Sequence, residues 1–316
     1  MNDKIDIVLP WLNGEDPYWL NEYTKYIKTV NHGDKSISRF RDWDTLRFLL
    51  RSIEENASWV NKVVLCVFDE HQIPNWLNVN NSKLKILYHK DYIPASCRPT
   101  FNGLCSSAFL FGHDCIANNI ISCNDDYIFV NKCKDTDFFI DNKCVKYYEI
   151  LPNAYKFYHQ RRNNAWCGIM ANTIEYKAKI TKNWNNYYTR HVPCSFHKND
   201  FLDFYKNNFN VLEKEFSKYE SKIRQISNLL PEYIVDWIQG DKKDYIQDKN
   251  FYDNYKVIDL HKNTKYKDIM DACLTKRCIC LNDQSSTMNN TEFYNMRNKV
   301  IKILTAVFPN KCSFEV

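Results

Sequence analysis

Two adjacent carboxylates, Asp125 and Asp126, lie between two short apolar segments of the chain. Neighbouring side chains at the end of a strand cannot both point into a hydrophobic core, so at least one must face solvent, a cleft or a cation. Carboxylate oxygens are the ligands that Mg²⁺ takes from proteins. The tripeptide Asn124-Asp125-Asp126 is also typical of a turn. The pair therefore predicts either a metal site or a solvated turn.

A group of arginines and carboxylates precedes an amphipathic segment in the first quarter of the chain. Arg41 and Arg47 flank Asp42 and Asp44. The planar guanidinium of arginine matches phosphate oxygens, so this group could bind the phosphates of a ligand. Alternatively, Asp42 or Asp44 caps a helix N-terminus and the arginines lie in solvent.

Three further side chains, far apart in the sequence, have chemistry that suits an active site. His191 could act as a base or contact a phosphate. Arg224 could bind phosphate oxygens, and Asp283, which ends an apolar run, could face a cleft. Each also has an ordinary structural alternative: a structural histidine, a surface ion pair and a helix cap, respectively.

The composition limits the class of protein and its partners. With 316 residues, 44% of them hydrophobic, the chain can form one large domain or one domain with a helical annex. Its net charge of +5 is spread along the chain, which favours anionic ligands, and no nucleic-acid-binding signature is present. No apolar run approaches the roughly 20 residues of a membrane helix, so we expect peripheral membrane association at most. The composition is also compatible with a homo-oligomer.

The cysteines indicate a compartment. The chain has 13 of them, an odd number, and does not start with a secretory signal. We therefore expect reduced thiols and a cytoplasmic location, with the inner face of the plasma membrane included. Structural zinc is the alternative, but Cys278 and Cys280 lie closer together than zinc-binding pairs usually do.

The elements that must position these residues alternate in type. The pattern predicts buried strands at residues 5–9, 62–68 and 84–88 and helices at 42–56, 106–121 and 201–222. This order indicates an α/β fold with a mostly parallel sheet flanked by helices, in which ligands bind at the carboxyl ends of the strands. A shift in composition divides the single unit into an α/β part, residues 1–150, and a more helical part, residues 151–316.

Four segments, in order along the chain, resemble the signatures of the Stealth family of sugar-phosphate transferases. The first segment is IDIVLPWLNGEDP, residues 5–17. The second starts with RFRDWDTLR and ends with NDD, and it includes residues 39–47, 50–54, 59–60, 72–77, 89–91, 99–102 and 124–126. The third is HVP followed by IR, residues 191–193 and 223–224, and the fourth is ICLND, residues 279–283.

This resemblance implies a GT-A-like α/β fold and a reaction. Similar proteins include bacterial capsular polysaccharide phosphotransferases and the catalytic core of N-acetylglucosamine-1-phosphotransferase. The resemblance implies transfer of a hexose 1-phosphate, typically that of an N-acetylhexosamine, from a UDP-sugar donor to a hydroxyl of a glycan acceptor. A phosphodiester forms and UMP leaves. The implied cofactor is Mg²⁺ or Mn²⁺, and the implied setting is capsule or surface polysaccharide synthesis.

The resemblance also implies roles for single residues. Asp125, Asp126 and Asp283 are expected to hold the metal. Asp126, His191 and Arg224 are expected to act on the transferred phosphate. Either Asp126 or His191 could be the base. The residues expected to bind the nucleotide sugar are Asp6, Trp11, Asn13, Gly14, Arg41, Asp44, Arg47 and Asn102.

The sequence also departs from the family pattern. The serine, histidine and glutamate that usually follow Asn102 in the family are replaced or displaced in residues 103–108, and Gln225 and Asn228 stand where carboxylates are common. These changes leave two alternatives open. One is a GT-A glycosyltransferase that moves the sugar without phosphate, and the other is a non-catalytic relative that binds glycans.

Overall fold

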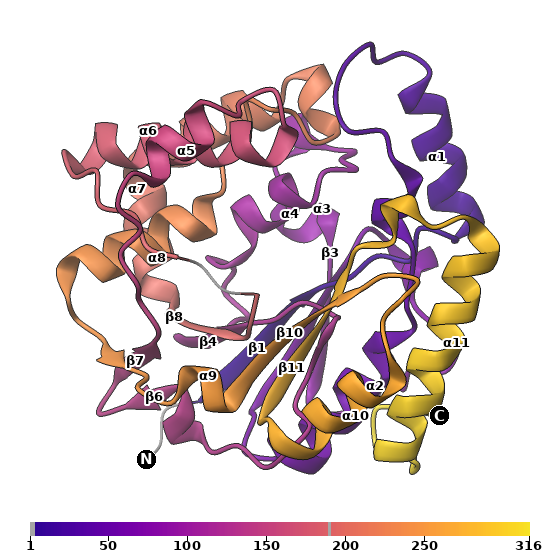
Figure 1. Cartoon of the computed structure of the whole chain (residues 1–316). Coiled ribbons are helices and arrows are strands. Elements are labelled where there is room, and N and C mark those ends of the chain that lie inside the picture. The colour runs from indigo at the N-terminus through magenta and orange to yellow at the C-terminus, as the bar shows by residue number, and fades with distance from the viewer. Residues whose placement is uncertain (1–3, 189–190) are drawn as a thin grey trace.

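A five-stranded sheet forms the centre of the computed structural model, which describes residues 4–188 and 191–316 (Figure 1). The strands are β1 (Ile5–Pro10), β2 (Lys62–Val67), β3 (Leu84–Tyr88), β4 (Asn119–Ser122) and β8 (Cys194–His197), in the order β3-β2-β1-β4-β8. The first four run parallel, and β8 is antiparallel to β4. The predicted α/β class with a mostly parallel sheet is confirmed.

Helices cover both faces of this sheet because the strand residues alternate between two cores. Along β1, Ile7 and Leu9 face one cluster of buried side chains, and Val8 faces the other. The first cluster is covered by α2 (Thr45–Asn56), α10 (Tyr266–Thr275) and α11 (Asn290–Val307). The second is covered by α4 (Gly103–Leu110), α6 (Ala165–Thr181), α7 (Lys198–Phe216) and α8 (Pro231–Lys242) (Figure 1).

Two smaller sheets join the halves of the chain. The first has the order β10-β11-β5, with β10 (Tyr255–Leu260) parallel to β11 (Cys278–Asp283), and β11 antiparallel to β5 (Tyr127–Ile128). The second has the order β6-β7-β9, with strands Phe139–Ile140, Lys143–Lys146 and Ile246–Gln247. Because β8 pairs with β4 and β11 pairs with β5, segments after residue 150 flank both sides of the turn that carries the aspartate pair.

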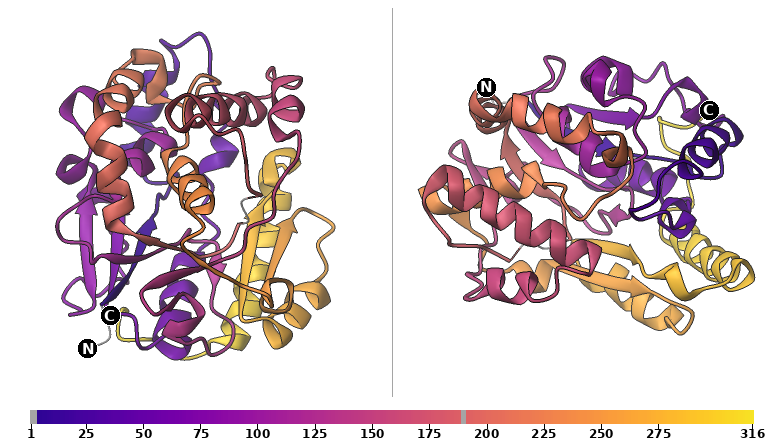
Figure 2. Two further views of the ribbon diagram at one scale, coloured as in Figure 1. Left: turned by 90° about the vertical axis from the view of Figure 1, so that its left-hand side faces the viewer. Right: turned by 90° about the horizontal axis from the view of Figure 1, so that it is seen from above.

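The remaining helices lie at the edges of this framework. They are α1 (Pro17–Ile27), α3 (His89–Tyr92), α5 (Ala154–His159) and α9 (Phe251–Asn254), with short 3₁₀ turns that include η1 (Ile37–Phe40) and η5 (Tyr219–Lys222). Seen from above, α5 and α6 lie on the side opposite α1 and α11 (Figure 2). Among the described residues, no helix combines the length and the apolar character needed to cross a bilayer. All thirteen cysteines are free thiols, and most are buried.

The predicted helix over residues 106–121 is wrong. The helix α4 ends at Leu110, and the chain passes through turns before Asn119–Ser122 forms a strand. Residues Asn119–Ser122, at the end of the predicted helix, form the strand β4, which is buried on both faces of the sheet. This strand pairs with β1 on one side and with β8 on the other. The two other predicted helices are shifted: α2 begins at Thr45, and α7 spans Lys198–Phe216.

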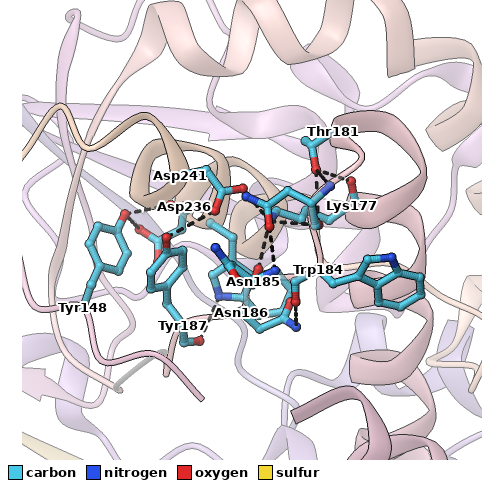
Figure 3. Close-up of polar contacts among 11 residues, drawn as sticks. Tyr148, Lys177, Thr181, Trp184, Asn185, Asn186, Tyr187, Asp236 and Asp241 are labelled. Atoms are coloured by element: carbon cyan, nitrogen blue, oxygen red, sulfur yellow. Dashed lines mark hydrogen bonds and ion pairs between the residues drawn. The ribbon is translucent and has the colours of Figure 1, made fainter. Parts of the chain in front are cut away.

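A buried lysine holds the residues that directly follow α6 (Figure 3). The side chain of Lys177 is 0% exposed, and its Nζ lies 2.5 Å from a carboxylate oxygen of Asp241. The same amine donates hydrogen bonds to the carbonyl oxygens of Asn183 and Asn185. The Tyr187 hydroxyl donates to the other oxygen of Asp241, so one charge pair fixes both ends of this loop.

We expect Lys177→Met to destabilise the protein by about 3–5 kcal/mol, because it leaves the Asp241 carboxylate buried without its cation. The measurement is the free energy of unfolding from urea titration. Lys179→Met is the matched control, because Lys179 is exposed on the same helix. Equal unfolding free energies for the two variants would contradict the structural role of the pair.

Candidate active site

A pocket of about 330 Å³ opens at the carboxyl ends of the central strands. Trp11, which directly follows β1, and Asp125, which follows β4, both line it. Arg41 and Asn102 complete opposite walls. The chain thus places its nucleotide-binding candidates where parallel α/β sheets bind ligands, and it places the aspartate pair at the edge of the same pocket.

The aspartate pair belongs to a larger group of carboxylates. Burial raises the pKa of Asp125 well above its ordinary range, and the charges of Asp126, Asp42 and Asp283 raise it further. Burial also raises the pKa of Asp126 to about 7, with a further contribution from Asp283. Asp42, which the sequence suggested only as a helix cap, has a pKa raised to about 6 by burial. Four carboxylates that repel one another provide a strong reason to bind a cation.

Three side chains are close enough to share one metal ion. Ligand atoms of Asp126, His191 and Cys280 all lie within 4.8 Å of one another. The Cys280 thiol donates to Asp126 Oδ2 over 3.5 Å. Asp126 Oδ1 and His191 Nδ1 are buried and have no hydrogen-bond partner among residues 4–188 and 191–316. These unsatisfied acceptors fit a divalent cation, which would supply the missing partner.

The chemistry of the donor atoms separates two kinds of cation. The carboxylate group alone offers the oxygen ligands that Mg²⁺ prefers. The set with imidazole and thiolate favours a softer ion such as Mn²⁺ or Zn²⁺. Asp283 accepts a hydrogen bond from the Ser285 backbone over 2.5 Å, which fixes its orientation at the end of β11. The residues therefore fit a divalent ion of either kind.

His191 lies beside Asp126, and Arg224 lies close enough to Arg39 and Tyr233 for their charges to act on it. Burial lowers the pKa of His191, so its imidazole is neutral at physiological pH. Burial, helped by Arg39, lowers the pKa of Arg224 to about 9, while Asp34 and Tyr233 oppose that shift. The buried Arg224 Nε has no hydrogen-bond partner among the described residues. A half-buried cation without a fixed anion is suited to an anionic ligand.

A second, smaller cavity of about 80 Å³ lies beside the same turn. His191, Glu232 and Tyr233 line it, and Asn124 lines both this cavity and the larger one. The Asn124–Asp126 turn is therefore the wall between two pockets. The sequence did not single out Glu232, because it lies in the first turn of an ordinary-looking helix and only the packing of α8 brings it to the site.

Asp6 and Arg47 do not join the site. Asp6 lies at the amino end of β1, 1% exposed, where its carboxylate accepts hydrogen bonds from Asn61 and from the Ala117 backbone. This corrects the expectation that Asp6 lies at the carboxyl end of the strand. The Arg47 guanidinium stacks over the Trp76 ring at 4.9 Å and pairs with a carboxylate near the C-terminus, away from the pocket.

Arg41 and Asn102 line the pocket, but their polar atoms are already used within the protein. The terminal nitrogens of Arg41 donate to backbone carbonyls of Ser285 and Met288 and to Asn290. These bonds connect the Arg41 segment to the loop after Asp283. Three of the five N–H donors of Arg41 are used in this way, so its predicted contact with a phosphate is limited to the other two and stays a prediction, whereas both amide hydrogens of Asn102 are bonded within the fold.

The amide of Asn102 is a connector between α4 and the Arg224 segment. Its Nδ2 donates to the Ser221 carbonyl and to Asn228 Oδ1, and its Oδ1 caps α4. The Asn228 amide accepts from the Gln225 backbone through the same Oδ1. An asparagine at position 228, where carboxylates are common in the family, therefore still receives both hydrogen bonds.

Asn13, Gly14 and Asp44 shape the entrance of the pocket through their backbones. Gln72 holds both backbone groups of Asn13, and the Gly14 amide donates to the Phe40 carbonyl over 3.0 Å. Asp44 begins α2 with a φ of 59°, and its amide donates to the Asp42 carboxylate. These contacts fix the loops around Trp11, and direct contact of the three residues with a nucleotide stays a prediction.

We expect Gly14→Ala to lower activity on the order of 10²-fold, because a Cβ at this position overlaps the Phe40 carbonyl and must push the pocket wall outward. The measurement is kcat/KM for the donor. Gly103→Ala is the control, since a Cβ there meets no atom within 4 Å. Unchanged kinetics in Gly14→Ala would show that the wall tolerates the shift.

We expect metal binding to release protons below pH 7. The folded protein holds the Asp126 carboxyl protonated up to a pKa of about 7, and a dication requires the ionised form. Metal affinity should therefore fall as the pH drops below 7 and level off above it. Calorimetric titration with Mn²⁺ in two buffers of different ionisation enthalpy measures the proton release. Equal heats in both buffers at pH 6 would contradict the expectation.

Comparisons with known proteins identify relatives along nearly the whole chain. A family model described as Stealth protein CR2, conserved region 2, matches residues 39–147. A capsular polysaccharide phosphotransferase WcwK of Streptococcus pneumoniae is 26% identical over 99% of this chain and 98% of its own length. The capsular polysaccharide phosphotransferase SacB of Neisseria meningitidis serogroup A is 27% identical over 96% of this chain and 49% of its own length.

Solved structures of glycosyltransferases also match. The galactosyltransferase LgtC in complex with donor and acceptor sugar analogs is 10% identical, with a TM-score of 0.40 over 95% of each chain. The glycosyltransferase GlyE of Streptococcus pneumoniae TIGR4 is 9% identical, with a TM-score of 0.38 over 99% of this chain and 64% of its own.

Proposed function

We propose that this chain, which is similar to Stealth proteins over residues 39–147 and to capsular polysaccharide phosphotransferases over nearly its whole length, transfers a hexose 1-phosphate from a UDP-sugar to a sugar hydroxyl. The product is a phosphodiester, and UMP leaves. The relatives that match it almost end to end carry the name capsular polysaccharide phosphotransferase. An N-acetylhexosamine donor is the expected case.

One observation carries the proposal: the turn with the aspartate pair separates two pockets, and His191 lines the smaller one. The half-buried guanidinium of Arg224 is close enough to Arg39 of the larger pocket and Tyr233 of the smaller one for their charges to act on it. A phosphoryl group in transit has equatorial oxygens that need cations and a nucleophile that needs a base. Arg224 would supply the cation and His191 the base, and the carboxylates would hold a metal ion beside them. A reaction at the sugar carbon alone has less use for Arg224.

The reaction is an in-line displacement at the phosphorus attached to the sugar. The acceptor oxygen bonds to this phosphorus, and the bond from the phosphorus to the bridging oxygen of the diphosphate breaks. UMP takes the electron pair, and the acceptor proton goes to a base. Asp126 and His191 are the two candidates for this base, and the short distance between them, with ligand atoms within 4.8 Å of each other, supports a shared role.

Different residues of the protein then contact different parts of the donor. Trp11 and the loop around Gly14 bound the pocket for the nucleotide, and Arg224 binds the oxygens of the transferred phosphate. A divalent cation held by Asp126 and its neighbours would offset the charge that develops on the diphosphate. The proposed setting is capsule or surface polysaccharide synthesis at the cytoplasmic face of the membrane, in line with the names of the relatives.

The nucleotide product tests the proposal. The protein is incubated with UDP-N-acetylglucosamine or UDP-N-acetylmannosamine, Mg²⁺ or Mn²⁺, and a panel of methyl glycosides. We expect UMP by chromatography and a phosphodiester resonance by ³¹P NMR. Release of UDP with a plain glycosidic product would instead identify a glycosyltransferase. Binding of glycosides without release of either nucleotide would identify a non-catalytic relative.

A further inference from the structure

The smaller cavity contains a carboxylate that the reaction described above does not use. Glu232 lines this cavity with His191 and accepts a hydrogen bond from the Ser122 hydroxyl. It has no ion-pair partner in the described part of the chain. The nearby charges are Asp236, one helical turn further along α8, and Lys146, whose amine is bonded to Asp236 over 2.6 Å.

The two pockets meet at the turn: Asn124 lines both, and among the described residues no other lining residue is shared between them. In an in-line displacement, the attacking oxygen and the leaving group lie on opposite sides of phosphorus. If UMP leaves into the larger pocket beside Trp11, the acceptor must approach from the side of the smaller one. The phosphorus then lies near Asn124, which lines both pockets.

A carboxylate on that side suits a hydroxyl and not a phosphate. Glu232 would repel the oxygens of a donor diphosphate, whereas a carboxylate readily accepts hydrogen bonds from sugar hydroxyls. Ser122 already occupies one lone pair of Glu232 and fixes its direction. The remaining acceptor sites of the carboxylate are available to a ligand in the cavity.

One aromatic ring, that of Tyr233, lines the cavity with this carboxylate, and a second ring, that of Trp166, lies against the first. Trp166, near the start of α6, is 36% exposed, and its ring lies 6.2 Å from that of Tyr233 at an angle of 86°. Tyr233 lines the smaller cavity beside Glu232. The cavity, at about 80 Å³, holds a hydroxyl group and its carbon but not a sugar ring. The ring of an acceptor would therefore stay outside, where Trp166 offers an apolar surface.

The geometry points to an acceptor subsite formed by α6 and α8, in which Glu232 binds the attacking hydroxyl of a sugar and Trp166 supports its ring. This inference rests on the proposed function, because it divides the two substrates of that reaction between the two pockets. It adds a residue on the acceptor side, separate from the groups that bind the donor.

Glu232→Gln tests the subsite, because it keeps the shape of the side chain and removes its charge. Two rates are measured: release of UMP from UDP-N-acetylglucosamine into water, and transfer to methyl glycosides of glucose, galactose, mannose and N-acetylglucosamine. We expect transfer to fall about 10²-fold while hydrolysis and the KM for the donor stay within twofold. Trp166→Ala should raise the KM for the glycosides. Glu55→Gln, an exposed change on α2, is the control.

Saturation-transfer NMR of the same glycosides, with UMP bound, gives a readout without turnover. We expect the signal to be lost in Glu232→Gln and kept in Glu55→Gln, at equal melting temperatures. Transfer and hydrolysis that fall equally in Glu232→Gln, or a glycoside signal that does not change, would overturn the subsite. Release of UDP by the wild-type protein would overturn the proposed function instead, and the ratio of transfer to hydrolysis would still report on Glu232.

Discussion

Asp126→Asn should abolish measurable transfer and at the same time raise the melting temperature of the metal-free protein. The loss has two causes, because Asp126 is both a candidate metal ligand and one of the two candidate bases. Removing a general base or a metal ligand commonly costs a factor of about 10² to 10⁴. The asparagine keeps the size of the side chain, so the fold is preserved.

The gain in stability follows from the sign of the pKa shift. Burial raises the pKa of Asp126 to about 7 in the folded protein, whereas an unfolded chain titrates near 4. The folded state therefore binds this proton more tightly, and the free energy of unfolding falls as the pH rises from 4 to 7. Above pH 7 the penalty is complete, and Asp126→Asn removes it.

Thermal unfolding in EDTA at pH 8 and at pH 5 measures this effect. We expect the melting temperature of Asp126→Asn to exceed that of the wild-type protein at pH 8, and the difference to shrink at pH 5. Asp203→Asn, an exposed change on α7, is the control and should leave both rate and stability unchanged. A variant that is inactive and also less stable at pH 8 would show that Asp126 has a structural role.

Arg224→Met should lower transfer by a factor on the order of 10² to 10³ and stabilise the protein. The guanidinium is half-buried, and its Nε has no partner within the described residues. Burial lowers its pKa to about 9, so holding it charged at neutral pH costs free energy in the folded state. The methionine removes this cost but also removes the donors for the phosphate oxygens.

Arg224→Lys separates charge from geometry. Lysine restores the positive charge but not the planar fork, so we expect only partial recovery of kcat. Arg161→Met, an exposed change at the end of α5, serves as the control. Rates are taken from UMP release and stabilities from urea unfolding. Equal activity of Arg224→Met and the wild-type protein would remove Arg224 from the reaction.

Asp126→Asn and Arg224→Met are both expected to lower activity and raise stability, for the same physical reason. The site gathers groups whose charged forms are costly without a ligand: carboxylates with raised pKa values and an arginine with a lowered one. A nucleotide sugar and a cation would supply the missing partners. These groups lower the free energy of unfolding of the free protein, and they favour binding of the ligands that supply their partners.

Local patterns were sufficient to predict the first strands and the position of the aspartate pair. Residues 62–67 and 84–88 form strands as expected, because each is a short apolar run bounded by polar residues. The same reasoning failed at residues 106–121, where a helix and a strand follow each other without a clear break in hydrophobicity. Whether an apolar run is a helix or a buried strand depends on its neighbours in the sheet.

The candidate site was predicted in outline but not in its composition. The sequence located Trp11, Asp125, Asp126 and His191, and the structure brings them to two adjoining pockets. It also located Arg224, whose place in the reaction stays a prediction. It gave no reason to select Cys280 or Glu232 over other buried thiols or helical glutamates. Nor did it show that the polar atoms of Asn102 are used within the fold, since this depends on contacts with residues more than 100 positions away.

The class of fold, the resemblance to a family and the order of the four segments could be read from residue types and spacing alone. Which side chains share a site became visible only in the folded chain. The pairing of β11 with β5 brings Cys280 to Asp126, and the packing of α8 against the sheet brings Glu232 to His191. Asp6 and Arg47 contact other residues, away from this site. The physical reason is that strand register and helix packing are set by long-range burial, which no local pattern records.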